Sequence, residues 1–281
     1  MTSKPTSVRS PHQSSWMKGL LIAVAAAYLF LILLLPAANV FVQAFIKGME
    51  PFLSNFNDAA FIHAVLLTLF MAGISVPLNT VFGLCAAWVI ARHQFRGRAL
   101  LISILDIPFS VSPVVAGLMI MLLYGRQGWL GPLFAQWDIQ IIFSPPSMIL
   151  ATAFVTMPFV AREVIPVLEE VGADQEEAAR TLGANDWQVF WRVTLPSIRW
   201  GLLYGLILTN ARAMGEFGAV SVVSGNIALK TQTLPLYVED AYKQYNTEAS
   251  YAAAVVLAAL AVITLIAKEV LERKTEIKDV E

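Results

Sequence analysis

The chain alternates long apolar stretches with shorter polar segments. Six apolar stretches stand out, at residues 19–46, 60–91, 99–125, 139–161, 200–228 and 249–267. Each has the length that a helix needs to cross a hydrocarbon layer of roughly 30 Å. The pattern therefore predicts an all-α integral membrane protein, with a single six-span bundle over residues 19–270 between polar tails at 1–18 and 271–281.

Two of these stretches carry residues that interrupt a simple membrane helix. Asp106, Pro108 and Pro113 fall within the third stretch, and proline removes a backbone hydrogen bond from a helix interior. We expect this stretch to be broken or kinked, with Asp106 capping one of its halves. The fifth stretch contains Arg212 and Glu216 four positions apart, which places both on one helix face, where they can neutralise each other.

A polar and charged block, residues 169–196, separates the fourth and fifth stretches. Asp174 and Glu177 form a capping-box pattern, which starts a helix one residue after Asp174. Gly183 follows about two turns later and supplies a residue that adopts the left-handed conformation at a helix end. The predicted short helix therefore spans residues 175–182.

Further signals define the surroundings and the faces of this short helix. Gly172 ends the helix before it, and Asn185 with Gln188 makes a second cap signal for the helix after it. The small and apolar residues share one side, and they are Ala178, Ala179 and Leu182. The charged residues face elsewhere, and they are Asp174, Glu176 and Arg180. A face of small residues lets another surface approach closely.

Composition agrees with a membrane protein and removes several other classes. Of the 281 residues, 57% are apolar and 14% are charged, and the mean hydropathy is +0.66. The net charge of -1 comes without a concentrated basic face, so we expect no nucleic-acid partner. The single cysteine, Cys85, excludes an internal disulfide and is expected to pack inside its apolar stretch.

Lys and Arg are distributed unevenly around the six stretches. Fourteen lie on the side that holds the N-terminal tail and the block at 169–196, and four lie on the other side. Because positive residues accumulate on the cytoplasmic side of a membrane, we expect both termini and the block to be cytoplasmic. We interpret residues 19–46 as a retained anchor, since no small-residue cleavage site follows that stretch.

A spaced motif runs through the polar block. It consists of Glu177-Ala178-Ala179, Gly183, Val193 and Leu195-Pro196. This spacing resembles the EAA loop in the membrane subunits of bacterial ABC importers, with Val193 where isoleucine is usual. The resemblance implies that residues 175–182 form a coupling helix that binds an ATP-hydrolysing subunit. It assigns this contact to Glu177, Ala178, Ala179, Leu182, Gly183, Leu195 and Pro196.

A second set of matches lies in and after the fifth stretch. RAMGEFGAV at 212–220, SVVSGNI at 221–227 and QTLPLYVEDAY at 232–242 carry it. These segments resemble the sulfate and molybdate permease branch, and most of all its W-type permease subunits for sulfate and thiosulfate. The resemblance covers essentially the whole chain in length, number of stretches and position of the motifs.

The resemblance implies a type I ABC importer permease that moves an oxyanion across a bacterial inner membrane by alternating access. It implies as partners a second homologous permease subunit, two copies of an ABC ATPase subunit and an extracytoplasmic sulfate-binding protein, beside the lipid bilayer. The chain carries no phosphate-binding loop, no H-E-x-x-H zinc pair and no G-x-S-x-G nucleophile elbow. We therefore expect no cofactor, metal site or catalytic residue in this chain, and expect ATP and Mg²⁺ to be used by the ATPase subunit.

Several interpretations remain open. Residues 176–193 also resemble a DNA-binding helix-turn-helix, although the first helix is acidic and the segment is tethered between membrane spans. Molybdate or tungstate is an alternative cargo, and an ion-coupled secondary transporter would need no ATPase. The candidate residues of the substrate path are Arg212, Glu216, Ser221 and Ser224. Arg212 either attracts the oxyanion or serves only as the structural partner of Glu216.

Overall fold

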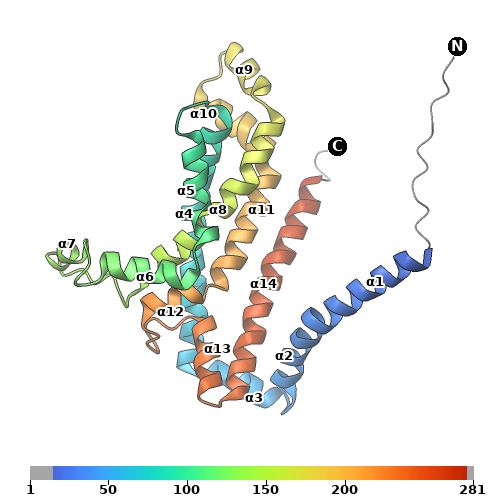
Figure 1. Ribbon diagram of the computed structural model, residues 1–281, viewed down its shortest axis with the longest axis vertical. Coiled ribbons are helices and arrows are strands. Elements are labelled where there is room, and N and C mark those ends of the chain that lie inside the picture. The colour runs from blue at the N-terminus through green and yellow to red at the C-terminus, as the bar shows by residue number, and fades with distance from the viewer. Residues whose placement is uncertain (1–14, 277–281) are drawn as a thin grey trace.

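The computed structural model describes residues 15–276, and within them it consists of helices and loops with no strand (Figure 1). The first half contains α1 (Ser15–Leu29), a π-helical turn (Phe30–Leu34), α2 (Leu35–Phe45), α3 (Met49–Ser54), a 3₁₀ turn (Asn55–Asn57), α4 (Ala59–Arg92), α5 (Arg98–Ser110), α6 (Pro113–Tyr124) and α7 (Gly131–Ala135). The second half contains α8 (Pro145–Val171), α9 (Asp174–Thr181), α10 (Asp186–Val189), η3 (the π-helical turn Phe190–Thr194), α11 (Leu195–Met214), α12 (Gly218–Ser224), α13 (Leu234–Lys243) and α14 (Thr247–Glu276).

The long helices α4, α8 and α11 pack side by side and form the centre of a bundle, which α14 joins (Figure 1). Close packing depends on two glycines that face α8. A Cβ added to Gly83 of α4 would lie 2.8 Å from the Cβ of Val160, and one added to Gly205 of α11 would lie 2.9 Å from the Val160 Cα. Small residues at such crossings let membrane helices approach closely. Val160 is itself fully buried between the two helices.

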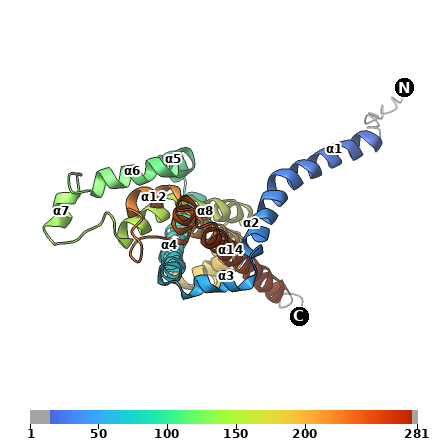
Figure 2. The ribbon, with the colours of Figure 1, turned by 90° about the horizontal axis from the view of Figure 1, so that it is seen from below.

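The first apolar stretch forms an arm that extends away from the bundle (Figure 2). Its continuous helical segment, Trp16–Phe45, has the length and composition to cross a membrane, and none of its most apolar window is buried within the chain. So much exposed apolar surface requires a nonpolar environment around the arm. The arm starts earlier than the sequence pattern predicts, because residues 15–18, assigned to the tail, already belong to α1.

The third stretch is broken, as predicted. Its halves α5 and α6 are bent by 108° relative to each other, and Pro113 stands in the first turn of α6. The predicted cap is wrong. Asp106 lies inside α5, two turns from its start, and its carboxylate pairs with Arg162 of α8 instead of capping the break.

The fifth stretch is also broken, which the sequence pattern did not predict. A single helix over 200–228 is wrong, because α11 ends at Met214 and α12 begins at Gly218. The carboxylate of Glu216, in the short connection, accepts a hydrogen bond from the backbone N–H of Ala219 at 2.8 Å. It therefore satisfies one of the unpaired donors that open the new helix.

Other boundaries and the number of spans also differ from the pattern. The fourth predicted stretch becomes α8, which starts at Pro145 and continues ten residues beyond Ala161 to Val171. Helix α14 runs through Glu276, into the predicted tail, and residues 1–14 and 277–281 lie outside the described part. By length and composition, three described helices could cross a membrane, or four if α5 and α6 count as one broken span. Six spans therefore stay a prediction. Cys85, expected to be packed, is exposed.

Candidate functional site

The polar block forms a compact helical cap at one end of the bundle, between α8 and α11 (Figure 1). Helix α9 covers Asp174–Thr181, within one residue of the predicted limits at both ends. Gly172 and Gly183 flank it with φ angles of 69° and 90°, the region that favours glycine. The glycines therefore end α8 and α9 as the sequence predicts.

One of the two predicted cap signals forms. Asn185 caps α10, because its side chain accepts a hydrogen bond from the Gln188 N–H at 2.8 Å, and the Gln188 side chain accepts one from the Asn185 N–H at 3.0 Å. The other prediction is wrong. Asp174 is the first residue of α9, and Ala173 takes the cap position without a side-chain bond. An acidic residue in the first turn still stabilises α9 through the helix dipole.

The residues assigned to the ATPase contact lie mostly on the surface of this cap. Leu182 is 88% exposed, although it is a large apolar residue. The exposed members are Glu177, Ala178, Leu182, Gly183 and Pro196, and the half-buried ones are Ala179 and Leu195. A surface of small residues with one protruding leucine is available for a partner.

Next to this surface stands an aromatic cluster that the sequence analysis did not single out. It consists of Trp187, Phe190 and Trp191. The ring of Trp187 lies 6.3 Å from that of Phe190, nearly parallel to it, and 5.5 Å from that of Trp191. Trp187 is 70% exposed and Trp191 is 50% exposed. Exposed tryptophans are enriched where protein interfaces form.

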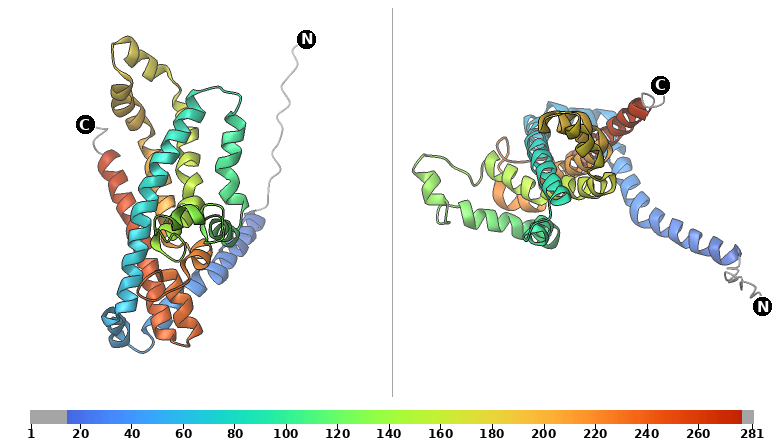
Figure 3. Two further views of the ribbon diagram at one scale, coloured as in Figure 1. Left: turned by 90° about the vertical axis from the view of Figure 1, so that its left-hand side faces the viewer. Right: turned by 90° about the horizontal axis from the view of Figure 1, so that it is seen from above.

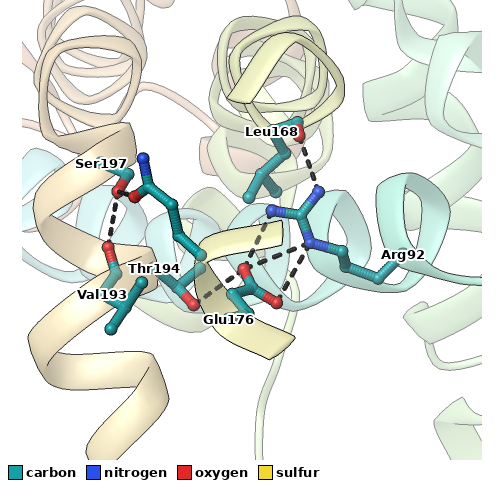
Figure 4. A network of polar contacts seen from close by, with 7 residues as sticks. Arg92, Leu168, Glu176, Val193, Thr194 and Ser197 are labelled. Atoms are coloured by element: carbon teal, nitrogen blue, oxygen red, sulfur yellow. Dashed lines mark hydrogen bonds and ion pairs between the residues drawn. The ribbon is translucent and has the colours of Figure 1, made fainter. Parts of the chain in front are cut away.

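A buried ion pair fixes α9 to the bundle, and the sequence analysis missed it (Figure 4). Glu176, expected to face away from the contact surface, does so but is only 3% exposed. Its carboxylate receives the Nη2–H of Arg92 at 2.9 Å and the Nε–H of Arg92 at 3.2 Å. The hydroxyl of Thr194 donates to the same carboxylate at 2.9 Å. Glu176 thus connects α4 with the π-helical turn η3.

The same arginine also reaches α8. Its Nη1–H donates to the backbone oxygen of Leu168 at 2.7 Å, so one guanidinium contacts both α8 and α9. Because Arg92 and Glu176 are 84 positions apart, no local pattern could have paired them.

A second ion pair connects the start of α5 to α8. The Nη2 atom of Arg98 lies 2.6 Å from the Oε1 atom of Glu169, and the Nε–H of Arg98 donates to the backbone oxygen of Ile90 at 2.9 Å. Because Arg98 opens α5, this contact places the start of α5 beside the end of α8. The cap and the ends of α4, α5 and α8 therefore form one connected unit.

The candidate substrate-path residues lie at the break between α11 and α12. The Nη1 atom of Arg212 is 2.6 Å from the Oε2 atom of Glu216, whose side chain is 1% exposed against 33% for Arg212. The predicted pair forms, although Glu216 lies beyond the end of α11. The hydroxyl of Ser221 donates to the Gly218 backbone oxygen, and that of Ser224 accepts from the Asn226 N–H. Neither of these two hydrogen bonds involves Arg212.

Comparison with known proteins places this arrangement in a family. Residues 79–277 match the family described as the binding-protein-dependent transport system inner membrane component. The chain belongs to this family. The matched region contains the last part of α4 and all of α5 to α14, and so includes both partners of the Arg92–Glu176 pair.

Individual relatives match the sequence of this chain along almost its whole length. The sulfate transport system permease protein CysW of Synechocystis is 70% identical, over 92% of this chain and 94% of the relative. The protein of the same name from Escherichia coli is 52% identical, over 93% of this chain and 90% of the relative. The resemblance to ABC importer permeases is confirmed.

The solved structures agree on the fold of this transport component. A chain of a bacterial alginate ABC transporter, solved with an alginate pentasaccharide-bound periplasmic protein, aligns with a TM-score of 0.79. The alignment covers 94% of this chain and 96% of that chain, at 16% sequence identity. At that identity the likeness concerns the fold, which is that of a type I ABC importer permease.

Proposed function

We propose that this chain is the membrane permease subunit of an ATP-driven sulfate importer and works by alternating access. One observation carries the proposal: identity of 70% and 52% over more than nine-tenths of the chain to proteins named as sulfate transport permeases. The segments 212–220 and 232–242, which resemble that branch, support the same cargo.

The partners follow from the exposed surfaces and the family. An ABC ATPase subunit docks on α9 and the adjacent residues Leu182 and Gly183, and it is this subunit that binds ATP and Mg²⁺. A second homologous permease completes the membrane part, two ATPase copies complete the motor, and an extracytoplasmic sulfate-binding protein delivers the cargo. The bound periplasmic protein of the alginate transporter supports this last partner.

The geometry at the cap supports a lever mechanism. Closing of the ATPase pair displaces α9. The Arg92–Glu176 pair passes the displacement to α4 and α8, because the guanidinium of Arg92, on α4, bonds both to Glu176 of α9 and to the Leu168 backbone oxygen of α8. The bundle then rocks between inward-open and outward-open states as packed rigid elements. In this arrangement α9, and with it both termini, lie on the cytoplasmic side.

Arg212 has a separate role at the break between α11 and α12. We assign it to the substrate path together with Glu216, Ser221 and Ser224. A guanidinium that is one-third exposed while its carboxylate partner is buried presents positive charge toward the accessible side. Ionisable groups at membrane depth tend to face a pathway.

The decisive experiment uses the assembled complex in proteoliposomes with its binding protein. We expect uptake of radiolabelled sulfate that requires ATP and competes with thiosulfate. Uptake of molybdate or tungstate in preference to sulfate would show that the proposed cargo is wrong. Uptake driven by an ion gradient without the ATPase would contradict the mechanism.

A substitution at the end of α9 tests the docking surface. Gly183→Leu places a large side chain where the glycine has open space around it and a φ of 90°, so we expect normal membrane insertion but no copurification of the ATPase. Gly183→Asn is the matched control, because asparagine tolerates left-handed conformations. Normal copurification and normal uptake with Gly183→Leu would disprove the assignment.

A further inference from the structure

The ion pair between Arg162 and Asp106 differs from the one between Arg92 and Glu176 at the cap. Arg162 of α8 and Asp106 of α5 lie 2.7 Å apart, from Nη2 to Oδ1, and their side chains are 54% and 34% exposed. The side chains of Arg92 and Glu176 are only 9% and 4% exposed. A buried pair is held by its surroundings, whereas this one lies open on the surface of the bundle.

The exposed pair joins two helices that could cross a membrane, α8 by itself and α5 as part of the broken pair α5–α6. Helix α5 begins at Arg98, which is bound to Glu169 near the cap, and it runs from the α9 end toward the middle of the molecule, where α6 turns away (Figure 3). Asp106 is eight residues into α5, about 12 Å along a helix that rises 1.5 Å per residue. Ionisable groups at such a depth face a bundle interior or a water-filled cavity, because contact with lipid is costly.

The pair belongs to a polar stripe along α5. Ser103, Asp106 and Ser110 are spaced by three and four residues, so they share one face of the helix. Both serines are exposed, and Asp106 is half-exposed. The exposed large residues of α5 are apolar, and they are Leu100, Ile104, Ile107 and Phe109. Helix α5 thus presents a narrow polar face, which we call the wet face, beside an apolar face suited to lipid.

Among the residues that the structure describes, the hydrogen bond and ion pair of Arg162 occupy one edge of its guanidinium and leave the other edge free. Its Nε–H donates to the Oδ1 atom of Asp106 at 2.9 Å, and its Nη2 atom contacts the same oxygen. The Cζ atom lies 5.0 Å from the ring centre of Phe109, which supports the guanidinium plane. The opposite edge, formed by Nη1 and Nη2, presents two parallel N–H groups that match two oxygens of a tetrahedral anion.

We propose that Arg162, oriented by Asp106 and Phe109, is a contact for the sulfate dianion in the half of the translocation path nearest α9. This inference rests on the proposed function and adds a residue to it. The carboxylate keeps the net charge of the pair at zero, so the dianion is attracted by the free edge and repelled by Asp106. Conduction requires binding that is weak enough for release, and this balance provides it.

Transport by the reconstituted complex separates a pathway role from a structural one. We expect Arg162→Gln to lower ATP-dependent sulfate uptake about tenfold or more, because the variant loses a charge-assisted hydrogen-bonding group. Subunit copurification should stay unchanged. The double variant Arg162→Met with Asp106→Leu replaces the pair by apolar residues, which a purely structural pair tolerates. Uptake near the wild-type rate with this double variant would overturn the proposal.

Cysteine labelling tests the wet face without any need for transport. In a Cys85→Ser background, Ser103→Cys and Ser110→Cys should react with a membrane-impermeant anionic thiol reagent, and sulfate should slow the reaction. Ile104→Cys, on the apolar face one residue away, is the matched control and should not react. Equal labelling at 103 and 104, or none at 103 and 110, would contradict the proposal. Wild-type uptake of a different oxyanion would instead refute only the proposed cargo.

Discussion

At the scale of single residues, the pair formed by Arg92 and Glu176 decides how α9 is held. Both side chains are buried, and every donor that approaches the Glu176 carboxylate comes from a different element, α4 or the turn η3. Removing one partner of such a pair leaves an uncompensated buried charge. The rigidity of the lever therefore depends on two side chains outside the EAA signature.

We predict that Arg92→Met lowers the free energy of unfolding of the cap by about 3–5 kcal/mol, the usual cost of breaking a buried pair. It should also weaken the stimulation of ATPase activity by the loaded binding protein. Thermal unfolding of the purified complex and ATPase assays measure both effects. Glu176→Gln should act in the same direction, and Glu170→Gln, at an exposed residue of α8 outside the proposed contact, should leave both quantities unchanged. Equal effects at 176 and 170 would contradict the lever role.

Tyr237 of α13 provides a pH-dependent contact at the other end of the bundle. Its hydroxyl donates to the Oδ2 atom of Asp58, the residue that caps α4, at 3.1 Å. Burial of the phenol, followed by its hydrogen bond to Asp58, raises the pKa of Tyr237 to about 12. The folded chain thus holds this proton more tightly than the unfolded chain, where tyrosine has a pKa of about 10.

The sign of the pH effect follows from this difference. The stabilisation is complete below pH 10 and is lost as the pH rises through 10 toward 12, because the unfolded chain releases its proton first. We predict that the unfolding temperature of the wild-type chain falls more steeply over that range than that of Tyr237→Phe. Tryptophan fluorescence in detergent at several pH values measures it. Parallel curves would show that the contact contributes nothing.

At the scale of elements, the packing of α4 against α8 depends on missing side chains. Gly83 faces Val160 at a distance that leaves no room for a Cβ, whereas Gly73 on the same helix has nothing within 4 Å. The two glycines look equivalent in the sequence. Their difference arises only where α8 crosses α4.

We predict that Gly83→Ala destabilises the bundle by about 1–3 kcal/mol, the typical cost of overpacking. The added methyl group must push Val160 away, and Val160 is fully buried. Gly73→Ala is the matched control, and a small gain in stability is expected because alanine favours helix. Thermal unfolding in detergent compares the two. A destabilisation of similar size at both positions would show that backbone flexibility, and not packing, is the cause.

At the scale of the whole molecule, large areas of apolar surface are exposed. The arm over Trp16–Phe45 is apolar and exposed, and α6 carries exposed large apolar residues along most of its length. These surfaces fit a chain that is surrounded by lipid and by a second permease. Across the six apolar stretches of the sequence, fourteen Lys and Arg fall on the side of the block at 169–196 and four on the other, which predicts the direction of the spans.

We predict that both termini and the α9 cap face the cytoplasm. In intact cells, a cysteine at position 177 should be protected from an impermeant thiol reagent, and one at position 243, the last residue of α13, should react. In inside-out vesicles the pattern should reverse. Reaction of both positions from the same side would exclude an odd number of spans between them and contradict the predicted topology.

Sequence alone determined the membrane class, the position of the short helix α9 and the family. Each of these depends on a local pattern: long apolar stretches, the glycines at 172 and 183, and the spaced motif from Glu177 to Pro196. Local patterns are legible because a helix and its ends are set by residues a few positions apart.

Only the tertiary structure decided which distant residues meet. It paired Arg92 with Glu176 across 84 positions and Arg162 with Asp106 across 56, and it reassigned Asp106 from a helix cap to an ion pair. It also broke the fifth stretch at Glu216, whose carboxylate opens a new helix. The physical reason is that a charge within an apolar stretch must find a partner or water, and which of them it finds depends on how the helices pack.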